Sequence, residues 1–190
     1  MTATPPTIPS LDAALSALRR GGVVAYPTEG VYGLGCDPRD AAAVARLLAL
    51  KGRPPTVGLI LIASEFNQLA PWLAPLDRAL EARAAATWPG PVTWVWPAAA
   101  AVDPALTGGR RTLAVRVTAH PAAKALCHEF GNPLVSTSAN RHGEPPARTA
   151  AEVRAAFGDA LDAVVDAPCG DLAGPTSIRD ALTGEVLRRG

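Results

Sequence analysis

Lys51 and Arg53 have the residue types and the spacing of an anion-binding site. The two cations flank Gly52 and precede Pro54, where a helix is expected to end. A lysine ammonium acts as a point charge, and an arginine guanidinium can hold two phosphate oxygens at once. The same pair could instead be a cationic helix end that interacts favourably with the helix dipole. Spacing alone leaves both interpretations open.

A second polar group is Ser136-Thr137-Ser138-Ala139-Asn140, at the expected end of an apolar strand. Its hydroxyls and amide are neutral donors and acceptors that suit a phosphate, a ribose or an amino acid. A polar turn or a helix cap would have a similar composition. This group is therefore a candidate binding segment with an ordinary structural alternative.

Arg116 is a charge inside the apolar segment Ala114-Val115-Arg116-Val117. A buried charge needs a partner, and either a ligand carboxylate or an internal Asp or Glu would serve. The segment 27–35 carries glycines but matches neither the P-loop nor the Gly-x-Gly-x-x-Gly pattern. We expect it to be a loop, either approaching a ligand closely or forming a tight turn. The segment Trp88-Pro89-Gly90-Pro91 favours a rigid structural turn.

Covalent catalysis finds little support in the sequence. No nucleophile and base stand at a recognisable spacing. The histidines lack metal-ligand spacing, and we expect surface or capping roles for them: His120, His128 and His142. The cysteines show neither disulfide nor metal spacing, and Cys36 is expected to be buried: Cys36, Cys127 and Cys169. The chemistry should therefore rest on positioning and on charge neutralisation.

Hydrophobic periodicity and turn residues predict the elements that would position these side chains. Strands are expected at 22–26, 58–63, 92–96, 112–117, 133–137, 163–166 and 185–188. Helices are expected after caps at Ser10, Asp40 and Thr149, and over 64–69, 76–88 and 120–130. The alternation predicts a single-domain α/β fold, with a twisted mixed parallel and antiparallel sheet and helices on its faces.

Length and composition limit the class of protein. The 190 residues fit one domain, which we place at 10–190 after a flexible N-terminus at 1–9. A net charge of +1 excludes a strongly basic or acidic tail but not a local basic patch. Residues 1–9 lack the features of a signal peptide, and no apolar run approaches the length of a membrane span. We therefore expect a cytoplasmic protein with no membrane partner.

Taken together, five segments in order resemble the YrdC-like family. They are 26–35, 51–54, 88–93, 113–117 and 136–140, and the ending Ile178–Glu185 resembles the short bacterial members of that family. The resemblance covers about Leu11 to Gly190 and implies a central cleft in the sheet. It also implies an activity, the synthesis of L-threonylcarbamoyl-AMP and pyrophosphate from L-threonine, bicarbonate and ATP.

The resemblance further implies partners and a metal ion. Mg²⁺ would be bound with ATP, and the product would pass to the tRNA threonylcarbamoyltransferase machinery, TsaD, TsaB and TsaE. In this reaction a carbamate oxygen attacks the α-phosphorus of ATP, and such chemistry depends on alignment and charge neutralisation. That requirement agrees with the residue types found above.

Residue roles follow from the resemblance, position by position. Lys51 and Arg53 would be catalytic. ATP-binding roles are implied for Lys51, Arg53, Thr112, Ser138, Asn140 and Arg188. Threonine-binding roles are implied for Thr28, Tyr32, Arg116, Ser136 and Thr176. No residue is assigned to a metal.

Three positions depart from the family pattern: Gly30, Val57 and Ile62 stand where relatives typically carry polar side chains. We expect fewer side-chain contacts to threonine and the triphosphate there.

A different class of function remains open, an RNA-binding module in tRNA or ribosomal RNA maturation, with tRNA or double-stranded RNA as the bound partner. It would gather cations on a concave face: Arg110, Arg111, Arg141 and Arg148. A near-neutral net charge makes this the weaker interpretation. A module of a larger carbamoyl-transfer protein is a third interpretation, and the chain length counts against it.

Overall fold

A computed structural model gives the structure of the chain and describes residues 10–52, 54, 56–141 and 143–190. Arg53, predicted to bind phosphate, and His142 lie outside the described residues, as does the segment 1–9.

The described strands form one sheet in the order β7-β1-β2-β6-β3-β5-β4-β8-β9. Their bounds are β1 Val24–Pro27, β2 Tyr32–Gly35, β3 Ile60–Ala63, β4 Val92–Pro97, β5 Thr112–Val117, β6 Leu134–Ser138, β7 Ala163–Val164, β8 Ser177–Asp180 and β9 Val186–Arg188. The sheet contains parallel pairs (β1/β7, β3/β5, β4/β8) and antiparallel ones, among them β1/β2 and β4/β5. The prediction of an α/β fold with a mixed sheet is confirmed.

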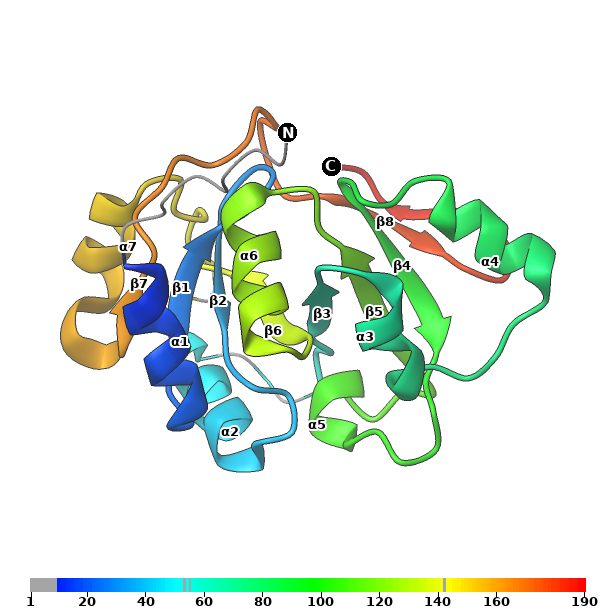
Figure 1. The fold of residues 1–190 in the computed structure, drawn as a ribbon, viewed down its shortest axis with the longest axis horizontal. Coiled ribbons are helices and arrows are strands. Elements are labelled where there is room, and N and C mark those ends of the chain that lie inside the picture. The colour runs from blue at the N-terminus through cyan, green and yellow to red at the C-terminus, as the bar shows by residue number, and fades with distance from the viewer. Residues whose placement is uncertain (1–9, 53, 55, 142) are drawn as a thin grey trace, which may run out of the picture.

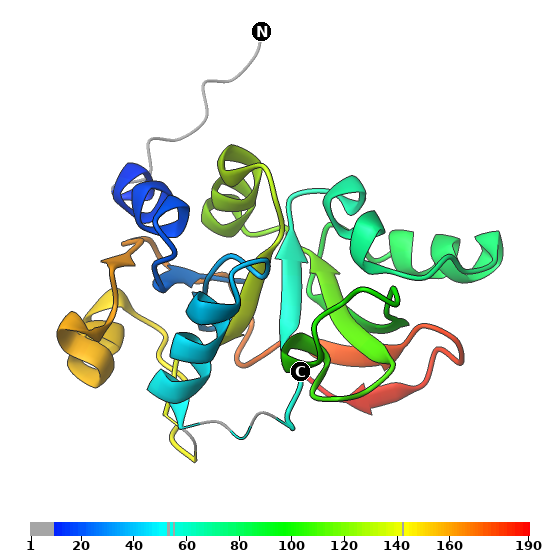
Figure 2. The same ribbon diagram turned by 90° about the horizontal axis from the view of Figure 1, so that it is seen from below.

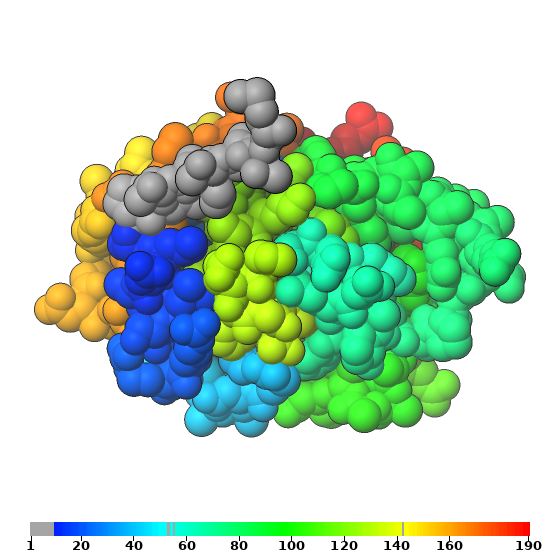
Figure 3. Space-filling model, in the orientation of Figure 1, coloured from blue at the N-terminus to red at the C-terminus, as the bar shows by residue number. Residues whose placement is uncertain are grey.

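Helices cover the sheet and extend beyond it (Figure 1). They are α1 Leu11–Arg19, α2 Ala41–Lys51, α3 Phe66–Leu69, α4 Arg78–Ala85, α5 Pro104–Thr107, α6 Pro121–Phe130 and α7 Ala150–Phe157, with short 3₁₀ turns at Ala70–Trp72 and Gly158–Ala160. In the space-filling view, α6 lies between α1 and α3 and hides the middle of the sheet from this side (Figure 3). Within the described residues, no helix has the length and apolar character needed to cross a membrane.

Local sequence signals explain most of the helix ends. The Asp40 side chain accepts from the backbone N–H groups of Ala42 and Ala43, and Thr149 caps α7 through the N–H of Glu152. Gly52 ends α2 with a φ of 59°, a conformation that glycine adopts without steric cost. Ser10 is a correction, because its hydroxyl does not cap α1. It donates instead to the carbonyl of Val164 at 2.9 Å, which fastens the start of α1 to β7.

The segment predicted as a loop, 27–35, is half of a β-hairpin. Strands β1 and β2 pair antiparallel, with Val24 opposite Gly35 and Pro27 opposite Tyr32. A Cβ built at Gly35 would lie 2.3 Å from the carbonyl oxygen of Val135, so glycine permits the close approach of β2 to β6. Glycine-rich composition suggested a loop, but here it serves strand packing. The sequence analysis also missed α5 and β8.

Strands β7 and β8 lie far apart in the sheet and are joined by residues 165–176, which we call the crossover segment. It leaves β7 at one edge and reaches β8 next to the opposite edge. It runs along the upper side of the molecule in Figure 1, while the β8–β9 hairpin forms one end of the sheet in Figure 2. Its backbone is held to the β1–β2 turn, because the N–H groups of Gly170 and Leu172 donate to the carbonyls of Thr28 and Glu29.

The structure also tests the roles expected for Trp88, the cysteines and the described histidines. The Trp88 indole donates to the carbonyl of Val92 at 2.8 Å and stacks near Trp96, which confirms a structural role for this turn. All three cysteines are free; Cys36 is buried, and burial raises the pKa of its thiol to about 12. His128 is exposed as expected, but His120 is buried at the first position before α6 without making a capping bond.

Candidate active site

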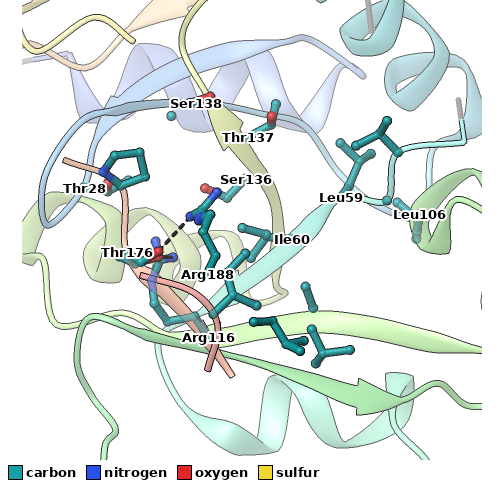
Figure 4. Close-up of a pocket in the computed structure, with 18 of the residues that line it drawn as sticks. Thr28, Leu59, Ile60, Leu106, Arg116, Ser136, Thr137, Ser138, Thr176 and Arg188 are labelled. Carbon is teal, nitrogen blue, oxygen red and sulfur yellow. Dashed lines mark hydrogen bonds between the residues drawn. The ribbon is translucent and has the colours of Figure 1, made fainter. Parts of the chain in front are cut away.

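A cavity of about 480 Å³ lies against one face of the sheet (Figure 4). Strand register explains why polar side chains from distant segments meet there. Ser136 is opposite Ile60, Ile60 is opposite Ala114, and Ser138 is opposite Gly33. Residues paired in this way project from the same face of a sheet. The register therefore collects the ends of β2, β3, β5 and β6 around one space.

Most of the described residues that were predicted to bind substrates line this cavity. They are Thr28, Tyr32, Thr112, Arg116, Ser136, Ser138, Thr176 and Arg188. Apolar side chains complete the wall, among them Leu59, Leu106 and Leu187. Lys51 and Asn140 are not part of the wall. Both contact Ser138, which does line the cavity.

Lys51 is a buried cation that contacts the polar segment after β6. It is 4% exposed, and its Nζ donates to the carbonyl of Ser138 and to the carbonyl and side-chain oxygen of Asn140. The Ser138 hydroxyl donates to the same side-chain oxygen, Oδ1, at 2.6 Å. A charged group held by several oxygens fixes the shape of the segment 138–140. The structure thus joins two segments that the sequence analysis treated separately.

A carboxylate of the chain itself neutralises the buried charge of Arg116. Nη2 of Arg116 lies 3.3 Å from Oε2 of Glu29, and both side chains are buried. Oε1 of Glu29 accepts from the hydroxyl of Thr118 at 2.7 Å and from the N–H of Ala119 at 3.0 Å. Of the two partners considered for Arg116, the internal one is present, so a ligand carboxylate is not needed to explain its burial.

Burial alone would raise the pKa of Glu29. The Arg116 guanidinium and the hydrogen bonds from Thr118 and Ala119 outweigh it and hold that pKa below its ordinary value. Glu29 is therefore ionised at neutral pH. Sequence analysis missed this residue, although its place beside Thr28 in the glycine-rich segment was a usable signal.

Two threonines hold the other side of the Arg116 guanidinium. Nη1 donates to Oγ1 of Thr93 at 3.1 Å and to Oγ1 of Thr176 at 3.0 Å. Thr176 was predicted from the resemblance, whereas Thr93 was not. Thr93 is fully buried on β4, and only the strand pairing brings it to Arg116.

Arg188 lies close to this group. Its Nη2 donates to the carbonyl of Thr176 at 2.7 Å (Figure 4). Burial and the neighbouring charge of Arg116 lower the pKa of Arg188 below its ordinary value. This end of the cavity therefore holds two guanidiniums.

Tyr32 lines the cavity, but its hydroxyl is directed to the crossover segment. Oη donates to the carbonyl of Ala167 at 2.6 Å and accepts from the N–H of the same residue at 3.3 Å. The hydroxyl thereby fastens the start of the crossover segment to β2.

The departures from the family pattern lie in three different environments. Val57 is exposed and lines the cavity with an apolar side chain. Ile62 is fully buried in the core beneath α6. Gly30 packs against the crossover segment, where a Cβ would lie 1.9 Å from the carbonyl oxygen of Gly174.

The cavity suits anions and carries no carboxylate among its lining residues, which include Arg110, Arg116 and Arg188. Nowhere in the described part of the chain do three or more His, Cys, Asp or Glu side chains gather as metal ligands. The donor set of the wall, hydroxyls and guanidiniums, does not fit a resident metal ion.

The arginines considered for RNA binding are partly engaged within the chain. Arg148 donates to the carbonyls of Leu172 and Ala173 in the crossover segment. Arg141 donates to the carbonyl of Ala156 and lies over the Phe157 ring. Arg110 lines the cavity. No observation on these residues favours the RNA-binding alternative.

Fold and site together define an α/β protein with a cavity lined by guanidiniums and hydroxyls on one face of a mixed sheet. The Sua5_yciO_yrdC family, described as telomere recombination, matches residues 16–190, and the chain belongs to this family. A threonylcarbamoyl-AMP synthase of Halorhodospira halophila is 60% identical over 176 residues, which are 93% of this chain and 92% of that protein.

Solved structures agree with this assignment. P. abyssi Sua5 complexed with L-threonine has a TM-score of 0.85 and 34% identity over 90% of this chain. The match covers 50% of the Sua5 chain, so this protein spans about half its length. E. coli YciO has a TM-score of 0.84 and 26% identity, over 97% of this chain and 91% of YciO.

Proposed function

We propose that the protein synthesises L-threonylcarbamoyl-AMP and pyrophosphate from L-threonine, bicarbonate and ATP. The observation that supports this proposal is one cavity whose wall includes Arg116, Ser136 and Thr176 together with Ser138, which Lys51 contacts. The support from relatives is the name threonylcarbamoyl-AMP synthase at 60% identity and the threonine complex of Sua5.

The reaction needs alignment more than it needs a protein nucleophile. The threonine amine and bicarbonate give a carbamate and water. A carbamate oxygen then attacks the α-phosphorus of ATP, and pyrophosphate leaves with its bonding electron pair. Fixed cations and donors around the reacting phosphate stabilise the charge that develops there.

The described residues would divide these tasks. Arg116 and Ser136 would hold the carboxylate end of threonine, with Thr28, Tyr32 and Thr176 around the amino acid. Thr112, Ser138, Asn140 and Arg188 would contact the nucleotide, and Lys51 would neutralise phosphate charge as it holds the segment 138–140. Arg53 keeps its predicted phosphate role. Since the wall offers no carboxylate ligand, Mg²⁺ would arrive as the ATP complex, bound by the triphosphate.

The product defines the kind of partner that must consume it. Threonylcarbamoyl-AMP is a mixed anhydride, so a transferase must move its carbamoyl carbon to an acceptor amine. The tRNA threonylcarbamoyltransferase machinery, TsaD, TsaB and TsaE, would supply that step. Binding of tRNA by the chain itself is a separate expectation, and its test is a salt series in a mobility-shift assay.

Pyrophosphate release is the measurement that tests the function. It should require L-threonine, bicarbonate and Mg²⁺–ATP together, and mass spectrometry should detect the adenylate. L-valine, which replaces the threonine hydroxyl by a methyl group, and L-serine, which lacks the methyl group, are the matched controls. Equal rates with either amino acid would refute the substrate assignment, and release without any amino acid would refute the reaction.

A further inference from the structure

The guanidinium of Arg116 is surrounded by groups of its own chain, and these have different roles. Thr93 and Thr176 accept from Nη1, whereas Glu29 lies beside Nη2 at 3.3 Å. Within the described residues, Nε of Arg116 has no hydrogen-bond partner. Nε is buried, and Nη2 on the same edge of the planar group lies beside Glu29, so Glu29 occupies this edge from within the chain.

Glu29 is held in place by several contacts besides its ion pair with Arg116. Its Oε1 accepts from Thr118 and Ala119, just before α6, and its backbone carbonyl accepts from Leu172 of the crossover segment. Its Oε2 has no aligned hydrogen bond among the described residues. The carboxylate therefore acts on Arg116 chiefly by charge, from a fixed position.

The balance of charges at this end of the cavity also supports a role for Glu29. Arg116 and Arg188 bring two positive charges, and Glu29, which does not line the cavity wall, brings one negative charge. One net positive charge therefore remains at this end of the cavity. Without Glu29, two adjacent guanidiniums would repel each other with only hydroxyls and carbonyls around them.

We propose that Glu29 is the positioning residue for Arg116: it fixes the guanidinium in the cavity wall, where Arg116 binds the carboxylate of the amino-acid substrate. This inference rests on the proposed function, because it assumes an amino-acid carboxylate at Arg116. Glu29 makes no contact with substrate and acts only through the arginine.

A double-mutant cycle of Glu29→Gln and Arg116→Met tests the proposal. In the wild-type background, E29Q should raise KM for L-threonine at least tenfold, leave KM for ATP within twofold and leave kcat within about threefold. In the R116M background, E29Q should change kcat/KM for L-threonine by less than twofold, because its target is gone. Asp162→Asn, which neutralises the partner of Arg46 elsewhere, is the matched control and should leave KM for L-threonine unchanged.

Stability measurements keep the test decisive if E29Q folds poorly. E29Q leaves a buried guanidinium without its counter-charge, whereas the double variant removes both charges. The double variant should therefore unfold at a higher temperature than E29Q, and its threonine kinetics remain measurable.

Three outcomes are distinguishable. An unchanged KM for L-threonine in E29Q, or an equal E29Q effect in both backgrounds, overturns the positioning role while the function stands. A double variant no more stable than E29Q overturns the charge pairing. A wild-type protein that releases no pyrophosphate with L-threonine overturns the proposed function itself, and the positioning role falls with it.

Discussion

The Glu29 carboxylate and the Arg116 guanidinium form a buried ion pair, 3.3 Å apart, with side chains 9% and 4% exposed. The pair joins the turn between β1 and β2 to the C-terminal end of β5, and these are more than eighty residues apart in the chain. It lies directly below the cavity whose wall includes Arg116.

Thr93→Val should weaken both the fold and the threonine site. The substitution keeps the side-chain shape but removes an acceptor from Nη1 of Arg116, which is buried. Leaving a buried donor with one fewer partner costs about 1–3 kcal/mol. Urea unfolding should show that loss, and KM for L-threonine should rise several-fold. Thr183→Val, on the exposed turn before β9, is the control. Unchanged stability in T93V would contradict the hydrogen bond.

Lys51→Met should abolish most of the activity while leaving a folded protein. Methionine keeps an unbranched stem but cannot donate to Ser138 and Asn140. Removal of a preorganised charged donor commonly costs about 10²–10³ in kcat. Initial rates of pyrophosphate release measure the loss. Lys124→Met changes the exposed lysine of α6 and is the matched control. A rate within threefold of wild type in K51M would refute its role.

Gly30→Ala should displace the crossover segment. The new Cβ would meet the carbonyl oxygen of Gly174 at 1.9 Å, two residues before Thr176 contacts Arg116. Overpacking of this kind costs about 1–3 kcal/mol, and we expect KM for L-threonine to rise with it. Thermal unfolding and kinetics check both effects. Gly174→Ala, whose Cβ would meet no atom within 4 Å, should be close to neutral. Equal behaviour of the two variants would argue against the contact.

His120 should make stability depend on pH. Burial lowers the pKa of His120, and the Pro168 carbonyl and the Glu29 carboxylate only partly oppose that effect. The unfolded chain then takes up a proton at about pH 6.5, before the folded one does. The free energy of unfolding should therefore fall as pH drops below about 6.5, until the folded histidine is protonated too.

Urea unfolding at a series of pH values compares wild type with His120→Asn. The variant cannot titrate in this range, so the difference between the two curves reports the histidine. His128→Asn, on the exposed side of the same helix, is the control and should follow wild type. Parallel curves for wild type and H120N would show that the buried ring contributes nothing.

Local sequence rules predicted the regular elements well where one physical signal dominated. The caps at Asp40 and Thr149 depend on a few neighbouring residues, and the structure confirms them. The hydroxyl cap predicted at Ser10 was wrong, and the loop predicted at 27–35 is confirmed only for the turn 28–31, because long-range partners decide both. Ser10 finds a partner on β7, and Gly35 is selected by the backbone of β6.

By itself, the sequence determined the α/β fold class and the family, and most of the described residues that it predicted to bind substrates do line the cavity. Motif residues in a fixed order need no geometry to be recognised. Only the tertiary structure decided what those residues contact. It paired Arg116 with Glu29, brought in Thr93, and turned the Tyr32 hydroxyl toward the crossover segment. Such partners lie on strands and turns distant in sequence, and the register of the sheet sets their distance, which no local pattern encodes.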